Sequence, residues 1–213
     1  VTNYSTHKRI YFYAIMPKNS MDSTQDIYRQ FLSAIHPLDD HIFHALFQSL
    51  QTRLYKKGED IVLQGHRQKE FYFVQSGTQM SYYEDEKKLL VLAFTYPPSL
   101  CAIPESFLTQ QPSPCCLTCV TDSTLLALSF DDLQILFDRY PSIERLFRKA
   151  TEKILIGILQ RHRELHTLTM EQRFSAFCSR SPHLLTMVPH KYIASYLGID
   201  ATNFSKLLRT VRF

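Results

Sequence analysis

Apolar residues repeat with a helical period near the start of the chain and with a strand period after it. Ile27, Phe31 and Ile35 recur every four residues, and a second apolar set follows them. This spacing predicts two short helices between residues 23 and 51. From residue 52 to 130 the chain shows short apolar or alternating runs of strand length, which predict an antiparallel sandwich or barrel.

Turn residues separate these strand-length runs. Gly58, Gly65 and Gly77 each stand between two runs, where a turn needs backbone freedom. The charged stretch EDEKK at 84–88 lies between two further runs and predicts the tip of a hairpin. Both observations support an antiparallel arrangement of the strands.

A long helix is predicted after the strand region. Residues 131–140 predict a short helix with an acidic start, and Pro141 begins a longer one that runs to about His166. Because the longer helix separates two differently built regions, we expect it to pair two copies of the chain. Packing against its own chain is the alternative. The residues expected at the contact are Leu146, Phe147, Ala150, Ile154, Gly157, Ile158 and Leu165.

Residues 189–211 have the pattern of two helices joined by a tight turn. Ile193 and the small Ala194 lie on the apolar face of the first helix, Gly198 supplies the turn, and Asp200 is placed to cap the second helix. This pattern is typical of a helix-turn-helix, although a helical hairpin that binds no DNA has the same pattern.

The outer side of the second helix is polar. If this helix entered a major groove, its outward side chains would read bases, and basic residues at its margins would hold phosphates. The residues expected at base edges are Thr202, Asn203, Ser205 and Lys206. The residues expected at phosphates are Lys191, Arg209 and Arg212.

Charge is divided unequally along the 213 residues. Residues 1–138 contain 11 Lys and Arg against 15 Asp and Glu, whereas residues 139–213 contain 13 against 5. The basic part is therefore a candidate for contact with a polyanion, and a solvated helix face is the plainer explanation.

Glycine is scarce, and its absence excludes several nucleotide-binding and hydrolase motifs. The chain has 5 glycines, where average usage gives roughly 15. No dinucleotide fingerprint, P-loop or G-x-S-x-G motif is present. Gly157 lies inside the long helix, where it costs up to about 1 kcal/mol relative to alanine. A close approach between two helices would account for it.

The cysteines and the N-terminal pattern favour a cytoplasmic protein. Five cysteines are unevenly spread, no signal-peptide pattern is present, and no apolar run is long enough for a membrane. Cys115, Cys116 and Cys119 form a cluster for which buried structural thiols, a redox sensor and a metal site are alternatives. On a strand, Cys116 would point away from the other two, which is poor geometry for a metal.

The spacing of the histidines does not indicate a catalytic metal site. His162 and His166 enclose a glutamate, but it is not at the second place that the zinc-protease motif requires. The strand region contains only His66, too few ligands for a barrel of the metal-binding type. We expect no metal, no cofactor and no enzymatic activity.

In their order and spacing, these parts resemble the Crp/Fnr family of bacterial transcription regulators. The resemblance covers residues 25–213 and is carried by KKGEDIVLQG (56–65), FYFVQSG (71–77), PSLCAIPESFLTQQPS (98–113), TDSTLLAL (121–128), FDRYPSIERLFRK (137–149) and PHKYIASYLGID (189–200). It implies an α+β fold: an antiparallel β-roll of the jelly-roll type with flanking helices, a long dimerisation helix and a C-terminal winged helix-turn-helix.

The resemblance also implies a division into parts. Residues 1–20, which show no clear period, would be a loosely ordered extension. Residues 21–138 would form a cyclic-nucleotide-binding-like effector domain, residues 139–168 the dimerisation helix, and residues 169–213 the DNA-binding domain.

The effector pocket implied by the resemblance lacks its usual ligand-binding residues. Family members that bind cyclic nucleotides present a Gly-Glu pair and, about ten residues later, an Arg that pairs with the phosphate. Here that Arg position falls on Ser113, and no Lys or Arg lies between residues 89 and 138. We therefore expect cyclic AMP and cyclic GMP to bind poorly. The residues of this degenerate pocket are Ile103, Glu105, Ser106, Phe107, Ser113, Cys115, Ile158 and Leu159.

The partners implied by the resemblance are double-stranded DNA, a second copy of the chain and RNA polymerase, without a membrane. An unidentified small-molecule effector is a further candidate partner. Where relatives that respond to cyclic AMP read bases with Arg, Glu and Arg, this chain has Ala201, Thr202 and Lys206, so its operator should differ. The alternative is a small-molecule sensor or protein-interaction module that has lost DNA binding.

Overall fold

A computed structural model describes residues 21–86 and 88–210. The predicted N-terminal extension and Arg212 lie outside these residues. Two helices open the described chain, α1 (Met21–Ser33) and α2 (Asp40–Gln48), and both predictions are confirmed. Tyr28 of α1 is buried, and its hydroxyl donates to the carbonyl oxygen of Val74 in the sheet at 2.7 Å.

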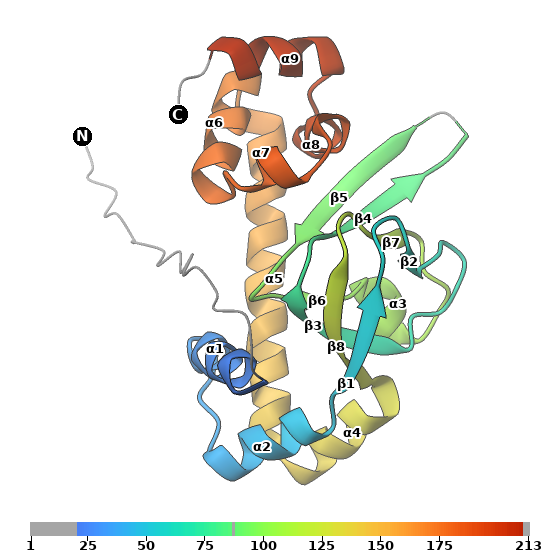
Figure 1. Cartoon of the computed structure of the whole chain (residues 1–213), viewed down its shortest axis with the longest axis vertical. Coiled ribbons are helices and arrows are strands. Elements are labelled where there is room, and N and C mark those ends of the chain that lie inside the picture. The colour runs from blue at the N-terminus through green and yellow to red at the C-terminus, as the bar shows by residue number, and fades with distance from the viewer. Residues whose placement is uncertain (1–20, 87, 211–213) are drawn as a thin grey trace, which may run out of the picture.

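Two four-stranded antiparallel sheets form the predicted β-roll (Figure 1). Their strand orders are β1-β8-β3-β6 and β2-β7-β4-β5. The strands are β1 (Gln51–Tyr55), β2 (Asp60–Val62), β3 (Glu70–Ser76), β4 (Gln79–Glu84), β5 (Leu89–Thr95), β6 (Leu100–Cys101), β7 (Cys116–Cys119) and β8 (Ser123–Ser129). A short helix, α3 (Pro104–Thr109), interrupts them between β6 and β7.

The predicted turns are confirmed by the backbone. Gly58, Gly65 and Gly77 have φ values of 84°, 82° and 88°, in the left-handed region that favours glycine. The charged stretch 84–88 joins β4 to β5 as expected, and the Asp85 side chain accepts from the backbone N–H of Lys88 at 2.9 Å.

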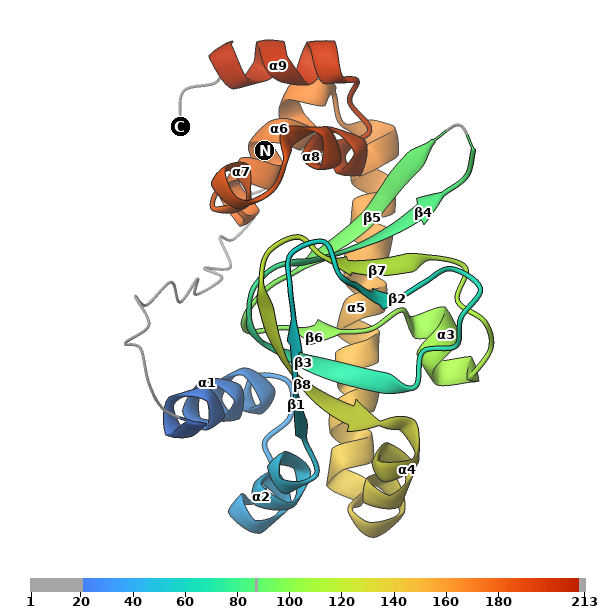
Figure 2. The ribbon, with the colours of Figure 1, turned by 45° about the vertical axis from the view of Figure 1, so that its right-hand side comes forward.

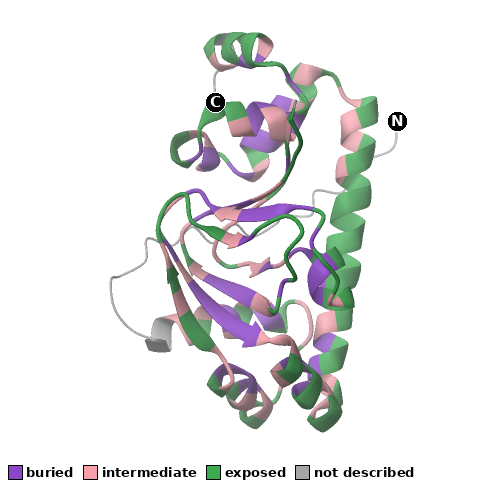
Figure 3. Ribbon diagram, turned by 90° about the vertical axis from the view of Figure 1, so that its right-hand side faces the viewer, coloured by how far each residue is buried: buried purple, intermediate pink, exposed green. Residues whose placement is uncertain are grey.

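The predicted helices after the roll are α4 (Phe130–Arg139) and α5 (Pro141–Thr167). The Ser129 hydroxyl caps α4 by accepting from the N–H of Asp132 at 3.0 Å. The first turns of α5 are covered by the chain itself, whereas residues 151–160 are exposed (Figure 3). Leu146 and Ala150, both expected at a contact with a second chain, are buried in their own subunit. That expectation is corrected for these two residues, because covered side chains offer no surface to a partner.

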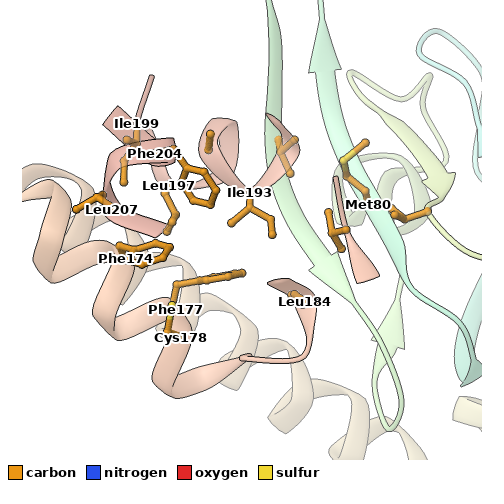
Figure 4. Packing of buried hydrophobic residues seen from close by; sticks show 14 residues of the cluster. Met80, Phe174, Phe177, Cys178, Leu184, Ile193, Leu197, Ile199, Phe204 and Leu207 are labelled. Atoms are coloured by element: carbon orange, nitrogen blue, oxygen red, sulfur yellow. The ribbon is translucent and has the colours of Figure 1, made fainter. Parts of the chain in front are cut away.

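Four helices form the C-terminal unit: α6 (Met170–Arg180), α7 (Leu184–Met187), α8 (His190–Leu197) and α9 (Ala201–Thr210). Their shared core includes Phe174, Phe177, Ile193, Leu197 and Phe204 (Figure 4). A capping box at Thr169 starts α6. Residues 169–210 contain no strand, so the expected wing is not among the described residues.

The β4–β5 hairpin reaches from the roll to the C-terminal unit (Figure 2). Met80 and Val91 of this hairpin belong to the same buried cluster as the core of helices α6–α9. The Ser195 hydroxyl of α8 donates to the carbonyl of Leu89 at 2.9 Å and accepts from the N–H of Val91 at 3.0 Å. Helix α8 therefore satisfies two backbone groups on the edge of β5 that no strand pairs.

None of the described helices combines the length and the apolar character that crossing a membrane requires.

Candidate functional site

Helices α8 and α9 are joined by a turn of three residues. Gly198 ends α8 with a φ of 62°, and Ile199 is buried between the helices. The Asp200 carboxylate accepts from the backbone N–H of Asn203 at 2.9 Å, which caps α9 as predicted. The residues from which the sequence predicted this turn therefore fix the orientation of α8 relative to α9.

The outward face of α9 presents short polar and basic side chains. Thr202, Ser205, Lys206 and Arg209 are all exposed. Ser205 donates its hydroxyl hydrogen to the carbonyl of Ala201 at 2.9 Å, so its oxygen stays close to the helix surface. These four residues form one exposed strip, here called the α9 strip.

Asn203 and Lys191 lie differently from the residues of the α9 strip. Asn203 is half-buried, and its side-chain amide donates to the Asp200 carboxylate at 2.5 Å, so it takes part in the cap of α9. Lys191 is exposed at the start of α8, with its ammonium 4.8 Å from the centre of the Tyr192 ring. Both remain within the C-terminal unit.

The predicted effector pocket centres on the segment from β6 through α3 to β7, here called the cassette. Ile103, Ser106, Phe107, Ser113 and Cys115 are buried in it, whereas Glu105 is exposed on α3. Five of the predicted residues are therefore buried, but they belong to different parts of the core: Ile103 and Cys115 lie in one cluster and Phe107 in another.

Two further predicted pocket residues lie on α5 and are not buried. Ile158 and Leu159 are 57% and 59% exposed. Neither is packed into the core of its own chain, so only a second chain or a movement of α5 could bury them.

The polar groups of the cassette are bonded within the chain. The Gln68 side chain accepts from the backbone N–H of Ile103 at 2.7 Å and donates to the carbonyl of Glu70 at 2.7 Å. Its backbone N–H donates to the Ser106 hydroxyl at 2.8 Å. The Ser113 hydroxyl bonds within its own turn, to the carbonyl of Cys115 at 2.6 Å. The Gln68 bonds join the cassette to the segment before β3, and the Ser113 bond closes the turn before β7.

Gln68 is a buried residue of this region that the sequence did not reveal. It lies in the polar run HRQKE (66–70), which looks like an exposed turn, yet Gln68 is 1% exposed. Its partners Ile103 and Ser106 are more than 30 positions away, and no local pattern links residues that far apart.

The five cysteines are free, buried thiols. Burial raises the pKa of Cys101 to about 12 and of Cys178 to about 11, and it also raises the pKa values of Cys115 and Cys119. A thiol that stays protonated is a poor nucleophile and metal ligand. The described residues contain no group of histidines, cysteines or carboxylates arranged to hold a metal.

Comparison with known proteins gives one family match and several matches to solved structures. Residues 52–140 match the family model of the cyclic nucleotide-binding domain. By sequence alone, no curated protein matches the chain.

Solved structures share the arrangement of most of the chain. FixK2 from Bradyrhizobium japonicum is 18% identical with a TM-score of 0.66, covering 75% of this chain and 83% of that one. A transcriptional regulator of the crp/fnr family from Eubacterium rectale is 16% identical with a TM-score of 0.64, covering 81% and 82%. The catabolite activator protein of Thermus thermophilus is 22% identical with a TM-score of 0.53, covering 82% and 84%. At these identities the likeness establishes a shared fold.

Proposed function

Because the chain contains a cyclic nucleotide-binding domain and has the fold of Crp/Fnr regulators, we propose that it is a homodimeric DNA-binding transcription regulator. The observation that carries the proposal is the α9 strip: short polar and basic side chains exposed directly after a tight turn. Such a helix fits the major groove, and the two copies in a dimer would read half-sites about one helical turn apart.

Within the α9 strip, position decides the proposed role. Thr202, Ser205 and Lys206 stand on the first turns of α9, the part of a recognition helix that contacts base edges. Asn203 is proposed as a base contact that must first leave Asp200. Lys191 and Arg209, together with Arg212, are proposed to hold phosphates and so to set affinity and register.

Dimerisation is proposed through the exposed middle of α5. Ile154, Leu155, Ile156, Ile158 and Leu159 are each at least 43% exposed. At about 100° per residue they cover more than half of the helix circumference, and an apolar helix surface of that width is normally buried. A second α5 would cover part of this surface, with Phe147, Gly157 and Leu165 at the ends and centre of the predicted stripe.

The effector pocket is proposed to bind no cyclic AMP or cyclic GMP. Phosphate capture depends on a charge-assisted pair with a cation, and the cassette has none between residues 89 and 138. The internal bonds of Gln68 and Ser113 also occupy its polar groups. Saturable binding of cyclic AMP at micromolar concentration would contradict this part of the proposal. The proposed setting is the cytoplasm, with RNA polymerase as a further partner and an effector of another chemistry left open.

DNA binding is tested by selecting sequences from a random duplex library with the full chain. Binding of the selected duplex is then compared for the wild type and for Lys206→Ala, Arg209→Ala and Lys57→Ala. Lys206→Ala should change which bases are preferred, whereas Arg209→Ala should weaken all duplexes alike and lower the salt dependence by about one phosphate contact. Lys57, exposed on the β1–β2 turn, is the charge-matched control.

Selection without any enriched sequence, and no binding above that of an unrelated basic protein, would overturn the proposal. It would favour the alternative of a sensor or interaction module whose helix-turn-helix is no longer used for DNA. Equal, uniform losses in Lys206→Ala and Arg209→Ala would leave DNA binding in place and show that the two roles are wrongly divided.

A further inference from the structure

A cavity of about 230 Å³ lies at the junction between the β4–β5 hairpin and the C-terminal helices. It is separate from the cassette and shares no residue with it. Phe94 and Tyr96 line it from the end of β5 and the segment after it, and Tyr196 lines it from α8. The remaining lining residues are Phe177, Arg180, Ser181 and Leu184, from α6, its C-terminal end and α7.

The walls of this junction cavity are mainly aromatic. The Tyr196 ring lies 5.3 Å from Phe94 and 5.9 Å from Phe177, measured between ring centres. The hydroxyl groups of Tyr96 and Ser181 are 2.6 Å apart and hydrogen-bonded, which ties the hairpin to the end of α6. Spacings of this kind are those of aromatic rings in direct contact, so Phe94, Phe177 and Tyr196 form one continuous aromatic wall against which a flat ring can pack.

The charges beside the cavity favour an anion. Arg180 contacts both carboxylate oxygens of Glu164, at 2.7 and 2.8 Å, and both bonds use Nη1. The guanidinium of Arg161 lies 3.4 Å from the centre of the Tyr196 ring and donates to the carbonyl oxygen of Tyr196. The region beside the cavity thus holds two guanidinium groups that are partly removed from water.

We propose that the junction cavity binds a small aromatic carboxylate. A cavity of about 150 Å³ is known to accept benzene, so about 230 Å³ leaves room for a ring and one carboxylate group. The ring would lie among Phe94, Phe177 and Tyr196, and the carboxylate would bond to Arg180 as Glu164 does now. Guanidinium groups bind carboxylates through paired hydrogen bonds, which gives the site its preference for an anion over a neutral ring.

The cavity has walls from both parts of the molecule, so its occupant would stabilise their contact. The Val91 amide reports that contact, because it belongs to an edge strand and donates to Ser195 on α8. When the C-terminal unit leaves the hairpin, this amide loses its partner and exchanges with solvent. An occupied cavity should therefore slow hydrogen exchange at Val91.

Titration calorimetry with benzoate and with benzyl alcohol, its neutral counterpart, tests the proposal on the full chain. Benzoate should bind saturably and more tightly than benzyl alcohol. Arg180→Gln should weaken benzoate at least about tenfold, whereas Glu164→Gln should tighten it, because the competing carboxylate is gone. Arg163→Gln, which removes an exposed arginine from α5, is the charge-matched control and should leave benzoate binding unchanged.

Arg180→Gln and Glu164→Gln have opposite expected effects on benzoate binding, so each tests the proposal independently. If Arg180→Gln fails to fold, as circular dichroism would show, the tightening in Glu164→Gln still stands or fails alone. The proposal is overturned if benzoate gives no saturable heat up to about 10 mM, if both probes bind equally, or if Glu164→Gln binds benzoate no better. It is also overturned if benzoate leaves exchange of the Val91 amide unchanged while Ser195→Ala speeds it.

Discussion

At the scale of single residues, Gly77 and Gly58 share a backbone conformation but differ in their surroundings. Both have φ above +80°. A Cβ added at Gly77 would lie 2.3 Å from the Ser123 hydroxyl and 2.5 Å from the carbonyl oxygen of Asp122, whereas one added at Gly58 would meet nothing within 4 Å. The pair therefore separates backbone strain from crowding.

We expect Gly58→Ala to lower the free energy of unfolding by about 1–2 kcal/mol, through strain alone. Gly77→Ala should cost about 1–3 kcal/mol more, because Ser123 and its backbone must move to admit the new carbon. Urea denaturation of the two variants measures the difference. Equal losses would show that the β3–β4 turn relaxes without cost, contrary to its tight contact with the start of β8.

Gln68 is the second residue whose role depends on its burial. Gln68→Ala leaves the buried N–H of Ile103 without its acceptor, and an unsatisfied buried donor costs about 1–3 kcal/mol. Gln64→Ala, four positions earlier and exposed, should change stability by less than about 0.5 kcal/mol. Chemical denaturation of both variants checks the contrast. If the two behaved alike, the cassette would not depend on Gln68 for its closure.

At the scale of elements, the sequence predicted most of the helices and strands but not the short helix α3 that interrupts the strands. Periodicity identified α1, α2, α4, α5 and the pair α8 and α9, because each has one apolar face. It did not identify α3, whose six residues PESFLT are too few to show a period. This segment carries a family resemblance but no periodicity, and its hydrogen bonds to Gln68 join residues more than 30 positions apart.

The apolar stripe predicted along α5 describes only part of its apolar surface. The predicted stripe mixes residues that the subunit buries, such as Leu146, with residues that it exposes, such as Ile154. A stripe reports that a face is covered and does not report by which chain. Leu155 and Ile156 lie outside it, and their exposure shows that the middle of α5 is apolar beyond one face.

Gly157→Leu distinguishes contact within the chain from contact between chains. Nothing lies within 4 Å of a Cβ built at Gly157, so one subunit has room for the new side chain and its helix should become slightly more stable. Close approach of a second α5 would be blocked, so the dimer should dissociate at a concentration at least about tenfold higher.

Sedimentation or light scattering over a concentration series measures this effect. Glu171→Leu, exposed on α6 and outside the proposed contact, adds the same side chain and should leave the assembly intact. A dimer equally strong in Gly157→Leu would place the contact elsewhere. It would also remove the reason for a glycine at this position.

At the scale of the whole molecule, the docking of the C-terminal unit on the β4–β5 hairpin was not predicted. Ser195 bonds to Leu89 and Val91, which are more than 100 positions away. One signal in the sequence did point to it: LLVLAFT (89–95) is apolar on both faces, whereas a strand facing water on one side alternates. The structure covers this run only in part, because Val91 is buried whereas Leu90 and Leu92 are 37% and 39% exposed.

The same junction should respond to acid through His183. Its ring packs 4.4 Å from Tyr96, between ring centres, and burial lowers its pKa below the ordinary value. In the unfolded or undocked state, His183 then binds a proton at a higher pH than in the docked state. Stability of the docked form is therefore complete above about pH 6.5 and is lost as the pH falls toward the lowered pKa.

Hydrogen exchange of the Val91 amide between about pH 7.5 and about pH 5.5 tests this, after correction for the intrinsic pH dependence of exchange. In the wild type, protection of Val91 should fall on acidification, and in His183→Gln it should be nearly independent of pH. His36 is the control: its pKa is also lowered, by partial burial and by Lys149, Arg145 and Arg148, but it follows α1, a helix that lies away from the hairpin (Figure 1). His36→Gln should therefore keep the wild-type response at Val91. The opposite result, a pH response of Val91 that is lost in His36→Gln and kept in His183→Gln, would contradict the prediction. It would place the acid-sensitive contact where α1 packs on α5.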